Sequence, residues 1–312
     1  MAEIRIGLAQ IDPRLGDVQA NVCKHLAFIE EAGRQEVQIL IFPELSLTGY
    51  FIKDLVSEVG LRANSALLAE LGMAAARAGL DIVLGFVEES PRYTYFNAAA
   101  YFHGGRLHHI HRKVYLPTYG LFDEQRYIGR GERIAAFDTP YLRSALLICE
   151  DMWHPSTVYV ASQDGADLLI CPSCSPGRGI ALRETRLGSA DSWERLCRTY
   201  AEFFVSFVVY CNRVGFEDGV NFWGGSLVVA PDGTVLLSAP LFEEGLYTVS
   251  IDPKALQRER VKLPLLRDER LDVTLQELQR IARARYQPMP DRDGHHPDIA
   301  SERERPNGHN RQ

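Results

Sequence analysis

Residues 37–44 read VQILIFPE, a short apolar run that stops at Pro43 and leaves Glu44 just past its end. A run of this length, rich in β-branched residues and closed by proline, is typical of a buried strand. Two other segments have the same form: RLHHIHRK (106–113) ends in Lys113, and SALLICE (144–150) carries Cys149 at its end. In layered α/β folds, functional loops converge at the carboxyl ends of strands. We therefore expect Glu44, Lys113 and Cys149 to occupy equivalent positions.

Strand and helix patterns alternate around these segments. Further strands are predicted at 4–10, 81–88, 95–103, 167–171, 207–212, 226–230, 234–238 and 246–251. Helices are predicted after Asp17, over 61–78, from Ser156 and over 189–204. Gly104-Gly105 and Pro231-Asp232-Gly233 predict hairpin turns, and the strand at 246–251 is expected to extend the sheet of the second hairpin. This order predicts a layered α/β architecture with mixed sheets.

Composition narrows the class of protein. The chain has 312 residues, 46% of them hydrophobic, and a net charge of −7. Without a basic stripe, a nucleic-acid partner is not expected. No positively charged leader precedes an apolar run, and no stretch approaches the ~18–20 apolar residues that span a bilayer. Six scattered cysteines favour reduced thiols over a disulfide framework, so we expect a soluble cytoplasmic protein with no membrane partner.

The composition changes at Gln287. From there to Gln312 the chain is dominated by Pro, Asp, Arg, His, Gly and Asn, and only three residues are apolar. Such a segment cannot bury enough apolar surface to offset the entropy lost on ordering. We therefore predict a globular domain over residues 1–286 and a mobile polar tail over residues 287–312.

Three ordered blocks carry a family resemblance: FPELSLTGY (42–50), HRKVYLPTYGLFDEQRY (111–127) and LLICEDMWHP (146–155). They resemble the signature blocks of the nitrilase superfamily of carbon–nitrogen hydrolases. Their amino-acid sequences are most similar to those of the glutaminase domain of glutamine-dependent NAD synthetases. The resemblance extends from about Ile4 to about Ile251. It implies a four-layer αββα sandwich with two mixed sheets, and assembly as a homodimer or larger homo-oligomer.

The resemblance also implies a Glu–Lys–Cys site. Cys149 corresponds to the nucleophile, Glu44 to the general base and Lys113 to the cation that stabilises the tetrahedral intermediate. Glu124, in the FDE turn, corresponds to a second glutamate that orients Lys113 and the substrate amide. The positions that line the acyl pocket in the glutaminase relatives are occupied here by Tyr50, Tyr119, Phe122, Glu150 and Ser173.

The implied chemistry follows from the side chains. A free thiol has a pKa of ~8.5 and is mostly protonated at neutral pH, so it needs a neighbouring base or cation. The base takes the thiol proton, and attack on an amide carbon gives a thioester and releases ammonia or an amine. Water then completes the cycle. A cation and backbone N–H groups stabilise the developing oxyanion. The scheme requires no metal and no organic cofactor.

Two other patterns are given less weight. Cys171 and Cys174 have C-x-x-C spacing, which occurs in zinc and redox sites. No second pair or histidine arrangement completes a metal site, and the segment aligns with the family's SxSP loop, with Cys174 in place of alanine. His108, His109 and His111 alternate on one strand, which favours a polar strand face over a metal site.

Three features depart from the glutaminase relatives. The segment after Ile251 contains no Gly-rich phosphate-binding loop for ATP. The stretch 177–191 is longer and richer in Arg and Gly, which suggests a reshaped entrance. Trp223 stands where the family's FDGGS motif carries aspartate. Glutamine specificity therefore does not follow from the resemblance.

These observations predict a hydrolase that cleaves a non-peptide C–N bond of a small linear amide with a polar or amino-acid-like acyl group. Glu150 favours an amide over a nitrile, because true nitrilases commonly carry tryptophan after the nucleophile. Two alternatives remain open. One is a nitrilase or N-carbamoyl hydrolase. The other is a glutaminase subunit that delivers ammonia to a separate synthetase.

Overall fold

A computed structural model describes residues 2–177 and 187–286. The predicted tail (287–312) and most of the stretch 177–191 lie outside these residues, so the domain boundary at 286 stays a prediction. The chain forms two compact units, residues 1–267 and residues 268–312. Of the second unit, helix α8 (Leu271–Tyr286) is described. None of the described helices is long and apolar enough to cross a bilayer.

The first unit contains two six-stranded sheets. The first sheet has the order β14-β1-β2-β3-β4-β5. In this sheet, β1–β2 and β2–β3 pair in parallel and the other neighbours are antiparallel. Its strands are β1 (Ile4–Gln10), β2 (Ile39–Ile41), β3 (Asp81–Glu89), β4 (Tyr95–His103), β5 (Arg106–Arg112) and β14 (Gly245–Ile251).

The second sheet has the order β13-β12-β9-β8-β7-β6, with parallel pairs β7–β8 and β8–β9. Both sheets are therefore mixed. Its strands are β6 (Ala136–Phe137), β7 (Ser144–Leu146), β8 (Leu168–Ser173), β9 (Phe207–Asn212), β12 (Leu227–Val229) and β13 (Val235–Ser238). A separate hairpin of β10 (Val214–Glu217) and β11 (Val220–Trp223) follows β9.

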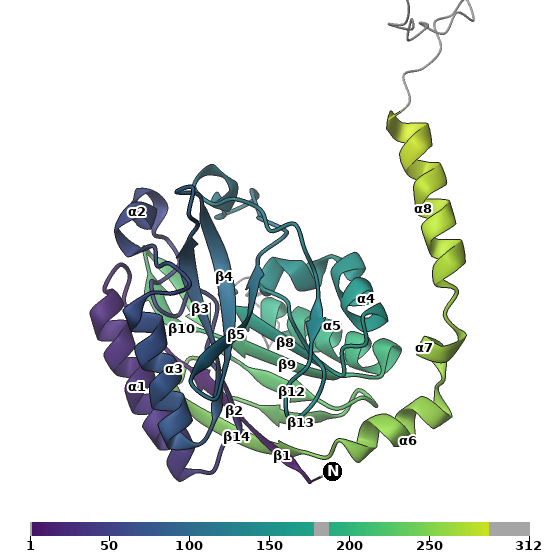
Figure 1. Cartoon of the computed structure of the whole chain (residues 1–312), viewed down its shortest axis with the longest axis horizontal. Coiled ribbons are helices and arrows are strands. Elements are labelled where there is room, and N and C mark those ends of the chain that lie inside the picture. Colours follow the sequence, from purple (N-terminus) through teal and green to yellow (C-terminus); the bar gives the residue numbers. More distant parts are fainter. Residues whose placement is uncertain (1, 178–186, 287–312) are drawn as a thin grey trace, which may run out of the picture. The chain divides into compact units, whose positions relative to one another are not determined.

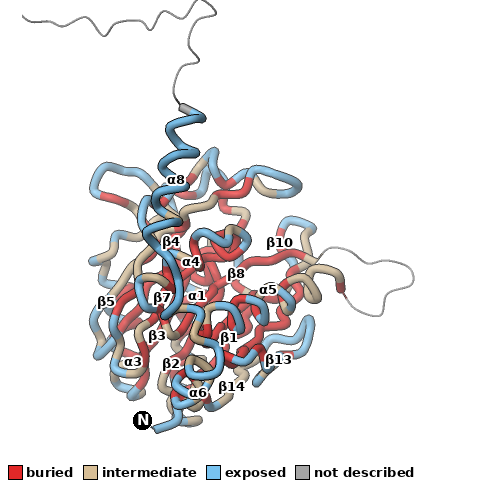
Figure 2. The backbone as a smooth tube through the Cα atoms, turned by 90° about the vertical axis from the view of Figure 1, so that its right-hand side faces the viewer, coloured by how far each residue is buried: buried red, intermediate tan, exposed pale blue. Residues whose placement is uncertain are grey.

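Helices cover the outer faces of the two sheets (Figure 1). Helices α1 (Val18–Arg34) and α3 (Ala66–Ala78) lie on the first sheet, and α4 (Pro155–Gln163) and α5 (Gly188–Phe204) on the second. Neighbouring residues of β2 show the layering: Ile39 and Ile41 belong to the core cluster between the sheets, while Leu40 belongs to the cluster under α1 and α3. The buried residues lie mainly along the strands (Figure 2). The structure thus has the predicted αββα architecture.

Several predicted elements need correction. The strand through Cys149 ends at Leu146, and Cys149 instead begins a short 3₁₀ helix, η3 (Cys149–Trp153). Strand β14 pairs with β1 in the first sheet and does not extend the hairpin sheet of β12 and β13. Helix α3 begins at Ala66 and not at the predicted residue 61: the Ser65 side chain accepts from the Leu68 N–H, and the helix closes on Gly79.

Smaller helices complete the described chain. The loop after β2 carries η1 (Lys53–Leu55) and α2 (Val56–Val59), and η2 (Glu124–Arg126) follows β5. The sequence did not predict α6 (Lys254–Lys262), α7 (Leu265–Asp268) or α8. Within the part of the chain that the structure describes, no three His, Cys, Asp or Glu residues are grouped to hold a metal ion.

Candidate active site

Lys113 lies at the centre of a buried cluster of charges. It directly follows β5, and its ammonium is completely buried, donating to Glu44 Oε1 and to Glu124 Oε1 at 2.7 Å each. Burial alone would lower the pKa of Lys113, but the carboxylates of Glu124 and Glu44 outweigh it and raise this pKa well above its ordinary value. Lys113 is therefore a permanent cation held between two acids.

Glu44 is fixed through both carboxylate oxygens. Oε1 accepts from the side-chain amide of Asn97 on β4, and Oε2 accepts from the backbone N–H of Cys174, each at 2.7 Å. The loop that carries Glu44 lies directly on β3: a Cβ added to Gly85 would come within 2.3 Å of the Leu45 nitrogen. Only glycine allows this approach. No sequence motif indicated Asn97 or Gly85.

Cys149 occupies a strained backbone position. Its φ of 45° lies in the left-handed region, which is costly for a residue other than glycine and is often found at functional sites. Its Sγ accepts from Ser173 Oγ at 3.2 Å. Burial, followed by the negative charge of Glu44, raises the pKa of the Cys149 thiol well above its ordinary value. The resting thiol is therefore protonated at neutral pH and needs a base before it can attack.

Glu124 differs from Glu44 because only one of its two carboxylate oxygens is hydrogen-bonded among the described residues. Oε1 accepts from Lys113 and from the Tyr50 hydroxyl. Oε2 is buried and has no hydrogen-bond partner among the described residues. Burial raises the pKa of Glu124 to about 7, even though Lys113 opposes the change. A buried acceptor without a partner is costly, so this oxygen is suited to receive a donor from a ligand.

Asp151 ties the turn of Cys149 to the loop of Lys113. Its Oδ1 accepts from the backbone N–H groups of the two residues after Lys113, at 3.0 Å each. Its Oδ2 accepts from the Ile148 N–H at 3.0 Å and bonds His111 Nε2 at 2.8 Å. From the sequence, His111 was predicted only to lie on a polar strand face. Its pairing with the buried Asp151 shows a supporting role at the site.

A cavity of about 450 Å³ opens beside the thiol. Within it, the Tyr119 hydroxyl donates to both oxygens of Glu150, at 2.8 and 3.0 Å. Burial raises the pKa of Glu150, while the hydrogen bond from Tyr119 opposes the change. The described lining residues are Tyr119, Phe122, Cys149, Glu150, Trp153, Ser175, Pro176, Gly188, Ser189, Ser192 and Trp193.

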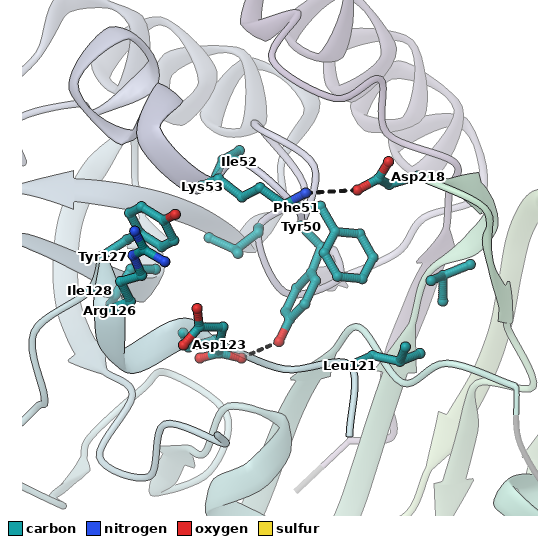
Figure 3. A pocket seen from close by; sticks show the side chains of 13 residues that line it. Tyr50, Phe51, Ile52, Lys53, Leu121, Asp123, Arg126, Tyr127, Ile128 and Asp218 are labelled. Atoms are coloured by element: carbon teal, nitrogen blue, oxygen red, sulfur yellow. Dashed lines mark hydrogen bonds and ion pairs between the residues drawn. The ribbon is translucent and has the colours of Figure 1, made fainter. Parts of the chain in front are cut away.

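A second cavity of about 400 Å³ lies on the other side of the 119–124 turn (Figure 3). Leu121, Asp123 and Glu124 line it, whereas Tyr119 and Phe122 line the cavity beside Cys149. Tyr50 also lines this second cavity, and its hydroxyl points at the Glu124 carboxylate. Of the five expected acyl-pocket residues, Tyr119, Phe122 and Glu150 line the cavity beside Cys149. Ser173 instead bonds the thiol, and Tyr50 supports Glu124.

Four residues that were not predicted to take part in catalysis have structural partners: Cys171, Cys174, His109 and Trp223. Cys171 and Cys174 are buried free thiols, and burial raises both pKa values. Cys174 Sγ donates to the Glu44 carbonyl oxygen at 3.0 Å. His109 stacks on Phe137, and burial lowers its pKa to about 4. Trp223 is buried against Tyr210 and does not line the cavity beside Cys149.

Comparison with known proteins places this geometry in a family. A profile of the carbon–nitrogen hydrolases matches residues 5–260. The glutamine-dependent NAD(+) synthetase of Thermotoga maritima is 33% identical over 258 residues, which cover 81% of this chain and 42% of that protein. The chain spans less than half the length of the curated relatives that it matches.

Solved structures agree with the sequence match. The glutamine-dependent NAD+ synthetase of Acinetobacter baumannii, in complex with ADP, is 29% identical, with a TM-score of 0.70 over 82% of this chain and 47% of that one. An amidase from Nesterenkonia sp. AN1, with the acetamide moiety of fluoroacetamide added covalently at its active-site cysteine, is 25% identical. Its TM-score is 0.72, over 88% of this chain and 96% of that one. This chain therefore belongs to the carbon–nitrogen hydrolase family, within the nitrilase superfamily.

Proposed function

We propose that this protein is an amidase that cleaves the C–N bond of a small linear amide through a thioester on Cys149. The observation that supports it is the Lys113 ammonium, held at 2.7 Å from both Glu44 and Glu124 beside a buried thiol. In a mutant of the Nesterenkonia sp. AN1 amidase, the acetamide moiety of fluoroacetamide is added covalently at the active-site cysteine, which supports a cysteine nucleophile here. The proposed catalytic residues are Glu44, Lys113, Glu124 and Cys149.

In the acylation step, Glu44 removes the proton of the Cys149 thiol as the sulfur attacks the amide carbon. Because burial disfavours a free thiolate, proton transfer and attack are coupled. Lys113 and the backbone N–H that follows Cys149 stabilise the oxyanion. Glu44 then gives its proton to the leaving nitrogen, the C–N bond breaks, and ammonia or an amine departs from the thioester.

In the deacylation step, Glu44 is a carboxylate again and removes a proton from water. The water oxygen attacks the thioester carbon, and the second tetrahedral intermediate uses the same oxyanion donors. Collapse breaks the C–S bond and releases the carboxylic acid, and the sulfur regains the proton from Glu44. Glu124 keeps Lys113 in place, and its unpaired Oε2 accepts a hydrogen bond from the substrate amide.

The cavity beside Cys149 supports a substrate with a polar acyl group. Aromatic side chains form much of its described wall, and Glu150 is the one acid among the described lining residues. Tyr119 holds Glu150 in place through two hydrogen bonds. A substrate amino group would pair with this carboxylate, and pairing relieves the cost of burying a charge. We infer that amino-acid-like amides are preferred.

The test is an assay of ammonia release from purified protein with matched amide, nitrile and N-carbamoyl compounds. The proposal expects turnover of amides and an acyl-enzyme whose intact mass exceeds that of the free protein by the acyl group on Cys149. Hydrolysis of nitriles or carbamoyl compounds in preference to amides would replace the amidase by one of these activities. Absence of any acyl adduct with all three classes would remove the thioester mechanism.

A second candidate is a glutaminase that supplies ammonia to a synthetase. The 33% identity to the Thermotoga maritima glutamine-dependent NAD(+) synthetase favours it. Glutamine offers both an amide and a free amino group, so it fits the same cavity chemistry. The two candidates differ in dependence on a partner. Ammonia release from glutamine that rises on adding an ATP-dependent synthetase supports delivery, whereas release that is independent of any partner supports the amidase.

The cellular setting is also a proposal. The six cysteines form no disulfide among the described residues, and the acidic composition offers no basic patch. We infer a cytoplasmic enzyme that assembles as a homodimer or larger homo-oligomer, as the family resemblance implies. Sedimentation equilibrium of the purified chain measures the oligomer directly, and a monomeric mass would contradict this inference.

A further inference from the structure

A buried ion pair lies beneath the catalytic cluster, away from the reacting atoms. Arg213 directly follows β9, and Glu217 is the last residue of β10. Their side chains are 0% and 3% exposed, and Arg213 Nη1 donates to Glu217 Oε2. Arg213 Nη2 also donates to Asp12 at 3.0 Å, and its guanidinium lies over the Phe222 ring. The pair is thus rigidly held.

Glu217 uses its second oxygen to hold the loop after β2. Oε1 accepts from the backbone N–H groups of Tyr50 and Phe51, at 2.8 and 2.5 Å. The loop comes close enough only because residue 49 is glycine: with its φ of +77°, a Cβ there would lie 2.8 Å from Glu217 Oε2. The Tyr50 hydroxyl then donates to Glu124, whose same oxygen accepts from Lys113. Figure 3 shows this Tyr50 contact as a dashed line.

The same short segment holds the loop on the nucleophile side. The Arg213 backbone N–H donates to the Ser173 carbonyl at 3.2 Å. Asn212 accepts from the Ser175 N–H at 2.8 Å and donates to its carbonyl at 3.4 Å. This loop carries the Ser173 hydroxyl that bonds Cys149, together with the backbone N–H that bonds Glu44. Residues 212–217 therefore connect both sides of the site.

We propose that Glu217 is a positioning residue: its Oε1 fixes Tyr50 so that the Tyr50 hydroxyl holds Glu124 against Lys113. The inference rests on the proposed function, because the residues that it positions are those assigned there. Stability alone is a poor reason for such a pair, since well-packed apolar residues often stabilise a core as well as a buried ion pair does. What apolar residues cannot replace is the oxygen that accepts from the Tyr50 and Phe51 N–H groups.

The test compares two double variants that both lack the ion pair. Arg213→Met with Glu217→Gln keeps an oxygen for the two N–H groups, whereas Arg213→Met with Glu217→Leu removes it. We expect the glutamine variant to keep kcat within about threefold of wild type, and the leucine variant to lose on the order of tenfold to a hundredfold. KM should change by less than about twofold, because the cavity beside Cys149 is built from other residues.

The role of Tyr50 is tested by repeating the comparison in a Tyr50→Phe background. If Glu217 acts through the Tyr50 hydroxyl, the glutamine and leucine variants should then differ by less than about twofold in kcat. A difference of the original size in this background, or equal kcat for the two variants in the wild-type background, overturns the proposal. If either double variant does not fold, Glu217→Leu alone is compared with Glu217→Gln alone in both backgrounds, with the same expected differences and the same overturning results.

Two further measurements distinguish positioning from a general effect on stability and from failure of the proposed function. Asp81→Asn is the control for stability. It removes a buried carboxylate at the first residue of β3, where Asp81 bonds Tyr101 and His103. The variant should lower the melting temperature while leaving kcat unchanged. Alkylation of Cys149 by iodoacetamide, mapped by peptide mass, gives the same comparison without amide turnover. The expected pattern in alkylation supports positioning even if no amide is hydrolysed, and equal alkylation rates overturn it.

Discussion

The charged cluster around Lys113 and the cavity beside Cys149 are neighbours that are built differently. In the cluster, Lys113 and both oxygens of Glu44 are buried and have fixed partners at 2.7 Å. In the cavity, Glu150 is held by Tyr119, a residue that is 53% exposed. Lys113 and Glu44 therefore have their partners before any substrate arrives, whereas Glu124 Oε2 and the cavity are left for a substrate to complete. In the proposed function, the first region determines the reaction type and the second region the substrate.

The cluster also depends on both sheets. Glu44 and Lys113 follow strands of the first sheet, whereas Cys149 follows β7 and Ser173 ends β8 of the second. Neither sheet alone brings a base next to the thiol. Packing of the two sheets therefore assembles the site. Two contacts join the sheets: Glu44 Oε2 accepts from the Cys174 N–H, and Asp151 bonds His111.

The largest expected effect is loss of the nucleophile. Cys149→Ala should lower kcat by at least about a thousandfold, because no other group can form the thioester. The fold should persist, since the variant removes one sulfur and leaves Lys113, Glu44 and Glu124 paired. Circular dichroism and intact mass after incubation with an amide are the measurements. Turnover within tenfold of wild type would remove Cys149 from the mechanism.

Lys113→Met should lower both the catalytic activity and the free energy of unfolding. It leaves Glu44 and Glu124 buried without their shared cation, and removing one partner of a buried pair typically costs about 3–5 kcal/mol. The free energy of unfolding, measured by urea denaturation, should fall by that order. As a matched control, Lys24→Met breaks a partly exposed pair with Glu244 and should cost less than about 1 kcal/mol. Equal costs would show that the cluster carries no buried charge.

Glu124 should make stability depend on pH in a defined direction. Its folded pKa of about 7 lies above its ordinary value of 4.5, so the folded state holds the proton more tightly than the unfolded state. Stability from this residue is present below pH 4.5 and is lost as the pH rises toward 7, by on the order of 2–3 kcal/mol. Glu124→Gln cannot titrate, so its unfolding free energy should fall less over this range. Parallel pH curves for the two proteins would contradict the raised pKa.

Substrate choice should respond to Glu150. Amides with a free amino group should exceed aliphatic amides of equal length by about 5- to 150-fold in kcat/KM, which is roughly 1–3 kcal/mol. Glu150→Gln should shrink this gap more than it lowers activity on neutral amides. Tyr119→Phe offers a milder version, because it removes the two hydrogen bonds and leaves the charge. An equal loss on both substrate classes would assign Glu150 a structural role only.

The sequence predicted the sheets because their strands are short apolar runs bounded by Pro, Gly or polar residues, as at 37–44. It did not predict the start of η3, because the Asp151 carboxylate that stabilises the left-handed turn at Cys149 accepts from the nearby Ile148 N–H and also from the Val114 N–H, which is distant in the chain. The pairing of β14 with β1 was missed for a related reason. The seven-residue strand that follows the last hairpin fits either sheet, and only tertiary packing decides.

The candidate site was predicted from the ends of strands and from the sequences of the motifs. These features indicate which residues take part but not which hydrogen-bond partners they have. Asn97 stands in the apolar strand YFNAAAYF, which signals a buried polar group without naming Glu44 as its acceptor. Arg213 and Glu217 were missed because they pair inside a segment read as a connection. Helix α8 was readable: Leu271, Leu275 and Leu278 recur at helical spacing, but the surrounding charges obscured the pattern.

The smallest effect is expected at the C-x-x-C pair. Cys174 supports Glu44 mainly through its backbone N–H, which any residue provides, and through a weak S–H contact to the Glu44 carbonyl. Cys174→Ala should therefore change kcat by less than about threefold and stability by less than about 1 kcal/mol. Activity should also survive EDTA, because no described group of His, Cys, Asp or Glu is placed to bind a metal. Cys174→Pro, which removes the N–H itself, is the informative contrast and should lose activity by at least about a hundredfold. If alanine were as damaging as proline, or if EDTA abolished turnover, the thiol would have a role of its own and the interpretation of Glu44 as a backbone-anchored base would have to be revised.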